Sequence, residues 1–204
     1  MPERADEDWI GDVLRFWFDD VGREAWFRKD AGIDDQIRAR FLILYEVLSR
    51  WPPSDALASP NRALATVLVL DQFPRNLFRG SAQAFATDAL AREVASGAIA
   101  KGFDAGFDKD RRLFLYLPFE HSEDKADQVR SVELISSLGD ADLADWAVRH
   151  KAVVDRFGRF PHRNAVLGRA STPEEEAFLQ EPGSSFSPRS AVGLTGRIGR
   201  PESV

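Results

Sequence analysis

The segment that most constrains the fold is an apolar stretch, broken only by Thr66, that follows a helix-start signal. Ser59 and Pro60 are the residue types of a helix N-cap and a first helical position. Residues 63–70 then read Ala-Leu-Ala-Thr-Val-Leu-Val-Leu, which would be apolar on every side of a helix. Periodicity alone also allows a buried strand, but the cap, the alanines and the lack of a partner strand favour a helix. We therefore predict a central helix surrounded by others.

Apolar residues elsewhere recur at steps of three and four. The clearest series is Ile33, Ile37, Phe41, Leu44 and Leu48, and Trp51-Pro52-Pro53 is expected to end that helix. No segment shows the alternation of a half-buried strand. The predicted fold class is all-α: a single domain, residues 1–186, built from roughly seven to nine antiparallel helices. Residues 187–204, rich in Gly, Ser, Pro and Arg, are predicted to form a tail that adds little stability.

Local signals place the boundaries of the later helices. One helix is expected from Ser81 to about Lys101, ended by Gly102, and another is expected to bend or end near Pro118. Ser122 is predicted to cap the helix that Gly139 ends, and Asp140 to cap the next, which closes at Gly158. Thr172-Pro-Glu-Glu175 has the pattern of a capping box and predicts a short final helix.

Three polar segments interrupt these helices. The first is Asp71-Gln-Phe-Pro-Arg-Asn-Leu-Phe-Arg-Gly80, and residues 156–169 repeat its Phe-Pro and Arg-Asn pairs. Because a proline ring clashes with a continuing helix, both Phe-Pro pairs are predicted to mark helix ends. The third segment, Phe119-Glu-His-Ser-Glu-Asp124, lies between them and combines a histidine with carboxylates.

Composition excludes several function classes. The net charge of −6 argues against broad electrostatic binding to nucleic acid or to an anionic membrane surface. The chain has no cysteine and three histidines, so disulfides and thiolate chemistry are excluded and a metal site is not predicted. No cofactor-binding motif is found. The acidic start of the chain lacks a signal-peptide core, and the 63–70 run is too short for a bilayer, so we expect a cytoplasmic protein.

The three polar segments resemble those of a bacterial family of unknown function, the domain-of-unknown-function family numbered 924. The resemblance runs in order from about Trp9 to Phe186 and includes Phe16-Trp17-Phe18 and Trp26-Phe27. It implies an all-helical, right-handed superhelical array of the tetratricopeptide-like class, and it implies no settled activity. The tetratricopeptide consensus itself is not visible in the chain, so peptide binding would be an analogy from fold.

The candidate site residues come from the same polar segments. Histidine titrates near neutral pH, and adjacent carboxylates would raise the pKa of His121. This combination predicts a catalytic group of His121, Glu120 and Glu123. Guanidinium forks suit carboxylates and phosphates. The predicted ligand-binding residues are Arg75, Asn76, Arg79, Asp124, Arg159, His162, Arg163 and Asn164. An architectural interpretation competes, in which the acids begin a helix and the arginines pair with Asp71 or nearby carboxylates.

Two functions from different classes follow. In the first, the polar segments converge on a pocket that binds, or binds and acts on, a small anionic molecule. In the second, they are purely architectural and the chain is a helical module that binds a protein partner. The two differ in one observable: whether Arg75, His121 and Arg163 line a shared cavity.

Overall fold

The structure, a computed structural model, describes residues 8–50 and 55–184, and no strand occurs in that part of the chain. The α-helices are α1 (Asp8–Arg15), α2 (Ala31–Arg50), α3 (Pro60–Val67), α4 (Phe73–Leu77), α5 (Asp88–Ala100), α6 (Lys109–Glu120), α7 (Lys125–Ser136), α8 (Ala141–Phe157) and α9 (Pro173–Leu179). Short 3₁₀ helices, η3 (Ala82–Phe85), η4 (Phe103–Gly106) and η5 (Pro161–Arg163), lie between them. The predicted all-α fold is confirmed.

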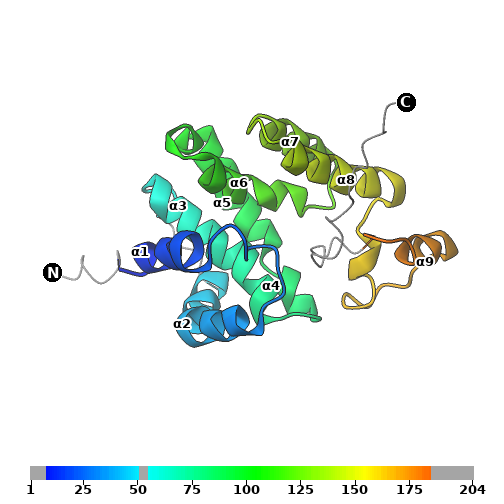
Figure 1. Ribbon diagram of the computed structural model, residues 1–204, viewed down its shortest axis with the longest axis horizontal. Helices are drawn as coiled ribbons and strands as arrows, with labels where there is room; N and C mark the ends of the chain where they lie inside the picture. Colours follow the sequence, from blue (N-terminus) through cyan, green and yellow to red (C-terminus); the bar gives the residue numbers. More distant parts are fainter. Residues whose placement is uncertain (1–7, 51–54, 185–204) are drawn as a thin grey trace, which may run out of the picture.

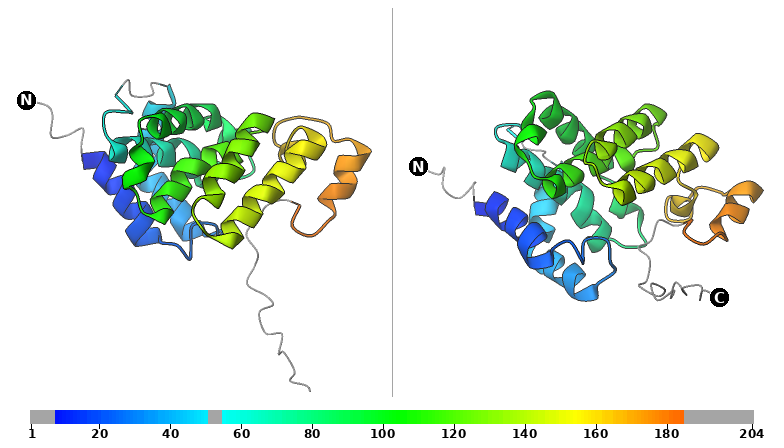
Figure 2. Two further views of the ribbon diagram at one scale, coloured as in Figure 1. Left: turned by 90° about the horizontal axis from the view of Figure 1, so that it is seen from above. Right: turned by 45° about the horizontal axis from the view of Figure 1, so that its top comes forward.

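The helices form a stack that follows the sequence (Figure 1). Helices α1 to α4 pack together at one end, with α1 against α3 and α2 against α4. Helices α6, α7 and α8 then lie side by side, and α9 sits at the end of the molecule far from α1 (Figure 2). Each of these contacts joins elements close in the chain, as expected of a helical array.

The predicted central helix is the core of this stack. Leu64, Leu68 and Leu70 have no exposed surface, and Phe73 at its end is equally buried. The ring of Phe73 lies 5.0 Å from that of Phe41 and 5.8 Å from that of Trp17, centroid to centroid. Aromatic pairs at these separations add to the apolar area that they bury. The all-apolar pattern of residues 63–70 is therefore explained by packing on every side.

The first Phe-Pro pair does not end this helix, so that prediction was wrong. A π-helical turn, η2 (Leu68–Gln72), widens the helix just before Pro74, and the chain stays helical to Leu77. A proline inside a helix leaves the carbonyl four residues earlier without its usual donor. Here that carbonyl, of Leu70, accepts a hydrogen bond of 2.5 Å from the Thr87 hydroxyl. A side chain distant in sequence thus replaces the missing backbone donor.

The second Phe-Pro pair does not end a helix either. Helix α8 stops at Phe157, and Gly158 closes it in the left-handed conformation, as predicted from the glycine. Phe160 is extended and Pro161 opens η5. A proline fits there because the first residues of a helical turn need no backbone N–H.

Two other predicted boundaries were also wrong. The helix expected from Ser81 to Lys101 is divided into η3 and α5, because Thr87 and Asp88 at the break bind other elements. Asp124, rather than Ser122, caps α7 and accepts hydrogen bonds from the amides of Ala126 and Asp127. Ser122 instead donates to the Asp127 carboxylate at 2.7 Å.

The remaining caps agree with the sequence. Ser59 caps α3, Asp140 caps α8, and Thr172 and Glu175 form the predicted capping box of α9. The prediction that Trp51-Pro52-Pro53 ends α2 and the predicted tail after residue 186 both lie outside the described residues.

Candidate functional site

Arg75, His121 and Arg163 line one cavity of about 560 Å³. Arg75 comes from α4, His121 follows the last turn of α6, and Arg163 belongs to η5. Apolar walls are contributed by Trp26, Phe27, Phe85, Leu117, Leu143 and Trp146. Side chains from three of the polar segments therefore meet, although 88 positions separate the first from the last in the chain.

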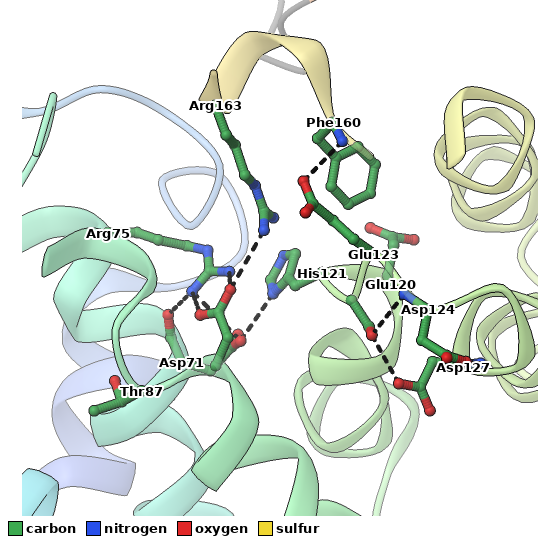
Figure 3. A network of polar contacts seen from close by, with 12 residues as sticks. Asp71, Arg75, Thr87, Glu120, His121, Glu123, Asp124, Asp127, Phe160 and Arg163 are labelled. Atoms are coloured by element: carbon green, nitrogen blue, oxygen red, sulfur yellow. Dashed lines mark hydrogen bonds and ion pairs between the residues drawn. The ribbon is translucent and has the colours of Figure 1, made fainter. Parts of the chain in front are cut away.

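Arg75 is bound by several acceptors of the protein (Figure 3). Its guanidinium binds the Asp88 carboxylate with two hydrogen bonds of 3.0 and 3.1 Å, and it also donates to the Asp71 backbone carbonyl. A further ion pair of 3.4 Å joins it to the Asp71 carboxylate. Burial alone would lower the pKa of Arg75, but the two carboxylates outweigh burial and raise the pKa. Arg75 is thus the cationic anchor of two buried acids.

Asp71 and His121 form a hydrogen-bonded pair at the wall of the cavity. His121 Nδ1 lies 2.8 Å from Asp71 Oδ1, and the amide of Gln72 donates to Asp71 Oδ2 at 2.6 Å. Burial would raise the pKa of Asp71, but Arg75 and His121 lower it to about 2, so the carboxylate is ionised. Burial and the charge of Arg75 lower the pKa of His121 despite Asp71, so its ring is neutral at pH 7.

Arg163 differs from Arg75 in having few partners. It is 7% exposed, and its guanidinium lies over the rings of Phe85 and Phe160, with centroids 4.5 and 4.7 Å away. Its one ion pair within residues 8–50 and 55–184 joins Nη1 to Asp88 Oδ2 at 3.5 Å, and its Nε has no hydrogen-bond partner there. Burial and the charge of Arg75 lower the pKa of Arg163 to about 10 despite Asp88, so its positive charge is incompletely compensated.

Glu120 brings a neutral carboxyl group to the same cavity. Burial and the negative charge of Asp71 raise the pKa of Glu120 to about 8, which keeps it protonated at neutral pH. Its Oε1 lies 3.6 Å from Nδ1 of His150, a nitrogen that also contacts the Trp146 carbonyl at 2.9 Å. Burial lowers the pKa of His150 to about 3, so this histidine is uncharged as well.

The sequence of this chain matches a family model described as a bacterial protein of unknown function, DUF924, over residues 13–183. The chain belongs to the DUF924 family. A solved structure, the protein of unknown function ATU0120 from Agrobacterium tumefaciens, is 43% identical, with a TM-score of 0.80. The similarity covers 84% of this chain and 96% of that one. No match was found among curated proteins. The matched DUF924 region contains every residue that lines the cavity.

Seven of the predicted site residues of this DUF924 chain line the cavity. They are Arg75, Asn76, Arg79, Glu120, His121, His162 and Arg163. Among them, Asn76 and Arg79 both bind Asp34 of α2, with Arg79 Nε 2.6 Å and Asn76 Nδ2 2.8 Å from its carboxylate oxygens. These two side chains therefore also tie α4 to α2.

The other four predicted residues lie outside the cavity lining. Glu123 accepts two hydrogen bonds from Arg169, at 2.7 and 2.9 Å, and one from the Phe160 amide at 2.8 Å. Arg159 binds Glu175 at 2.6 and 2.7 Å, and Asn164 contacts the same carboxylate at 3.3 Å. Asp124 caps α7, so the contacts of all four residues join or cap elements of the fold.

No site role was predicted for Asp88, Gln72 or the aromatic side chains around Arg163. Asp71 was considered only as an architectural partner. A buried Asp beside an Arg four residues later is a local signal, but Asp88 begins another helix and its pairing with Arg75 is tertiary. Within the described residues no group of three His, Asp or Glu could hold a metal ion, and no helix is long and apolar enough to cross a membrane.

Proposed function

We propose that this protein binds a small organic anion in the cavity, with Arg163 as the principal contact. The observation that carries the proposal is a buried guanidinium whose Nε has no hydrogen-bond partner in residues 8–50 and 55–184. Leaving a buried charged donor unsatisfied is unfavourable, so native proteins rarely keep one without a reason. A carboxylate or phosphate oxygen in the cavity would supply the missing acceptor.

The sharing of Asp88 supports the same proposal. Arg75 takes both oxygens of this carboxylate at hydrogen-bonding distance, whereas Arg163 reaches one of them at 3.5 Å. Two buried cations therefore compete for one acid, and the second lacks full compensation. A bound anion would restore the balance.

The size and lining of the cavity fit a small molecule with an apolar body. Its volume of about 560 Å³ is within the range of ordinary ligand sites, roughly 300–1,000 Å³. Trp26, Leu117 and Trp146 provide apolar surface, while Arg28 and Lys29 add positive charge to the lining. We therefore favour a carboxylate or phosphate attached to an aliphatic or aromatic group.

The alternative of a protein-interaction module has less support. The exposed large apolar side chains of the described residues are Phe27, Ile43, Val47, Val129 and Val148. They are divided among α2, α7, α8 and the segment before α2. Ile43 and Val47 lie one turn apart on α2, and the others are on separate elements; exposed apolar residues in such small groups are normal for a protein surface.

The test compares melting temperatures with and without phosphate and a panel of aliphatic and aromatic carboxylates. An anion at about 100 times its dissociation constant should stabilise the wild type by about 2.7 kcal/mol. Arg163→Met should stay folded, because Asp88 keeps Arg75, and should lose the response to anions. Arg156→Met is the matched control, since Arg156 is exposed and binds Glu174 outside the cavity. If no anion shifts the wild type and Arg163→Met unfolds, the proposal is wrong.

A further inference from the structure

His121 has the surroundings of a base rather than of a merely structural histidine. The Gln72 amide nitrogen donates to Asp71 Oδ2 at 2.6 Å, and the Arg75 guanidinium forms an ion pair of 3.4 Å with Oδ1, so the ionised Asp71 carboxylate acts only as an acceptor. The contact of 2.8 Å between His121 Nδ1 and Asp71 Oδ1 must then be an N–H donor on the histidine. That tautomer leaves the lone pair on Nε2.

The Nε2 lone pair is available to a molecule in the cavity. The His121 ring makes no hydrogen bond other than the one to Asp71 within residues 8–50 and 55–184. His121 contributes to the cavity lining, and its side chain is 14% exposed. A histidine whose Nδ1–H is held by a buried carboxylate is a well-oriented general base.

Glu120 can supply a hydrogen-bond donor in the same cavity as His121. Glu120 precedes His121 in the chain, lines the same cavity and carries a protonated carboxyl group. Its Oε1 lies 3.6 Å from Nδ1 of His150, beyond hydrogen-bonding distance. The Glu120 hydroxyl can therefore donate to an oxygen of a bound molecule.

None of the described residues that line the cavity is Ser, Thr, Tyr or Cys, so this lining offers no hydroxyl or thiol nucleophile.

We infer that His121, oriented by Asp71, removes a proton from carbon in an oxo acid whose carboxylate is bound by Arg163. The inference rests on the proposed function and names the ligand class and the chemistry. Proton removal breaks the C–H bond next to the carbonyl and forms an N–H bond at His121 Nε2. The electron pair left on carbon forms a C=C bond, and the carbonyl π electrons move to its oxygen. Glu120 donates to that oxygen, so charge develops beside a positioned donor. Return of the proton completes the cycle without a further reactant.

The decisive experiment is hydrogen–deuterium exchange at the carbon of the ligand. The wild type is incubated in D₂O with pyruvate, longer aliphatic oxo acids and phenylpyruvate, and proton NMR follows loss of the signal next to the carbonyl. We expect at least one oxo acid both to raise the melting temperature and to exchange faster than in buffer. His121→Gln keeps an N–H donor for Asp71 but has no imidazole. The variant should bind the same acid, and its exchange rate should be lower than that of the wild type by a factor of about 100 or more.

The outcomes separate this inference from the proposed function. If organic anions stabilise the wild type but no oxo acid among them exchanges above background, the inference is overturned and the binding site remains. Exchange by His121→Gln at the wild-type rate also overturns it. A second readout needs no ligand: nitrogen-15 NMR of labelled histidine should show His121 protonated on Nδ1 at pH 7. Finding the proton on Nε2 would contradict the assignment. Arg156→Met again serves as the control, with unchanged exchange.

Discussion

Arg75 and Arg163 line the same cavity and carry the same charge, but their environments differ. Arg75 binds both oxygens of Asp88 and lies 3.4 Å from Asp71, whereas the Arg163 guanidinium has a single ion pair, of 3.5 Å, within the part of the chain that the structure describes. Residue type therefore does not decide which one is available to a ligand. The number of acceptors around each guanidinium does, because only an unsatisfied donor gains from a new acceptor.

The same substitution should consequently have opposite effects on stability. Arg75→Met leaves Asp71 and Asp88 without their main cation and should reduce the free energy of unfolding by about 3–5 kcal/mol. Arg163→Met removes an incompletely compensated charge and should change stability much less. Urea denaturation of the two variants at pH 7 measures the difference. Equal losses would mean that Arg163 is as architectural as Arg75.

Glu120 should make stability depend on pH in an unusual direction. Its pKa is about 8 in the folded protein, well above the ordinary value of 4.5. Between these values the folded state binds a proton that the unfolded state has released, so this group reduces stability as pH rises from about 4.5 to 8. Glu120→Gln should be more stable than the wild type at pH 8, by about 2–4 kcal/mol, and nearly equal to it at pH 4.5.

The measurement for Glu120 is urea denaturation of both proteins at pH 4.5, 6 and 8. The comparison is needed because two histidines also make stability depend on pH. The pKa values of His150 and His162 are about 3 and 4 in the folded protein, below the ordinary 6.5, so both residues increase the free energy of unfolding as pH rises toward 6.5. Both histidines are present in the variant, so their contribution cancels in the difference. A difference that does not change with pH would contradict the raised pKa of Glu120.

At the scale of elements, the π-turn before Pro74 connects the packing of the central helix to the position of Asp88 in the site. The Leu70 carbonyl that Pro74 leaves without a backbone donor is bound by Thr87, and Thr87 immediately precedes Asp88 of α5. The start of α5, and with it the acid that holds Arg75, is therefore fixed against the interrupted helix. A proline that would disrupt an isolated helix is tolerated because another element satisfies the exposed carbonyl.

Thr87→Val removes that hydroxyl while keeping the shape of the side chain. It should lower the free energy of unfolding by about 1–3 kcal/mol, the range for leaving a buried acceptor unsatisfied. Thr87→Ser, which keeps the hydroxyl, is the control and should lose less. Urea denaturation distinguishes the two. If Val and Ser cost the same, the hydrogen bond to Leu70 contributes nothing measurable.

Leu68 tests the central helix itself. Its side chain has no exposed surface, so Leu68→Ala should cost about 2–5 kcal/mol in urea denaturation, from lost transfer energy and from the cavity left behind. The control is Ile43→Ala on α2, which also shortens an aliphatic side chain to alanine. Because Ile43 is 77% exposed, the free energy of unfolding should change by no more than about 0.5 kcal/mol. A small effect at Leu68 would place this helix outside the cooperative core.

At the scale of the whole molecule, the segment that carries Arg163 has its own small core. Val153, Val154 and Phe160 form a buried cluster with Phe157 and Phe178, separate from the main core. The Glu123–Arg169 pair ties this segment to the turn before α7. Arg163 is thus held over the cavity by a small cluster and an ion pair that lie outside the main core.

Glu123→Gln should therefore loosen residues 158–180 more than the rest of the chain. The amide cannot form the charged pair with Arg169, and segments with a separate core can open locally without global unfolding. Hydrogen exchange followed by mass spectrometry should show faster exchange in this segment, with α3 to α6 unchanged. Anion binding should weaken because Arg163 is less well positioned. Uniform acceleration over the whole chain would show that the segment opens only with global unfolding.

Much of the fold could be predicted from the sequence because its determinants are local. The caps at Ser59, Asp140 and Thr172 and the helix end at Gly158 depend on residues within about four positions of each other. The apolar stretch of residues 63–70 likewise identifies its helix as central, since no other arrangement buries all of its sides. The three polar segments could be recognised as candidates for a site on their residue types alone.

Only the tertiary structure decided which polar residues meet and which remain available. Asp88 and Thr87 looked like ordinary residues inside a predicted helix, yet they hold Arg75 and the carbonyl before Pro74. Arg159 and Arg163 are four positions apart, but Glu175 binds the first, whereas the guanidinium of Arg163 lies over two aromatic rings. Pairing between charged groups depends on distances across the fold, and burial then sets the protonation of Glu120 and His121. Neither distance nor burial can be obtained from residue spacing along the chain.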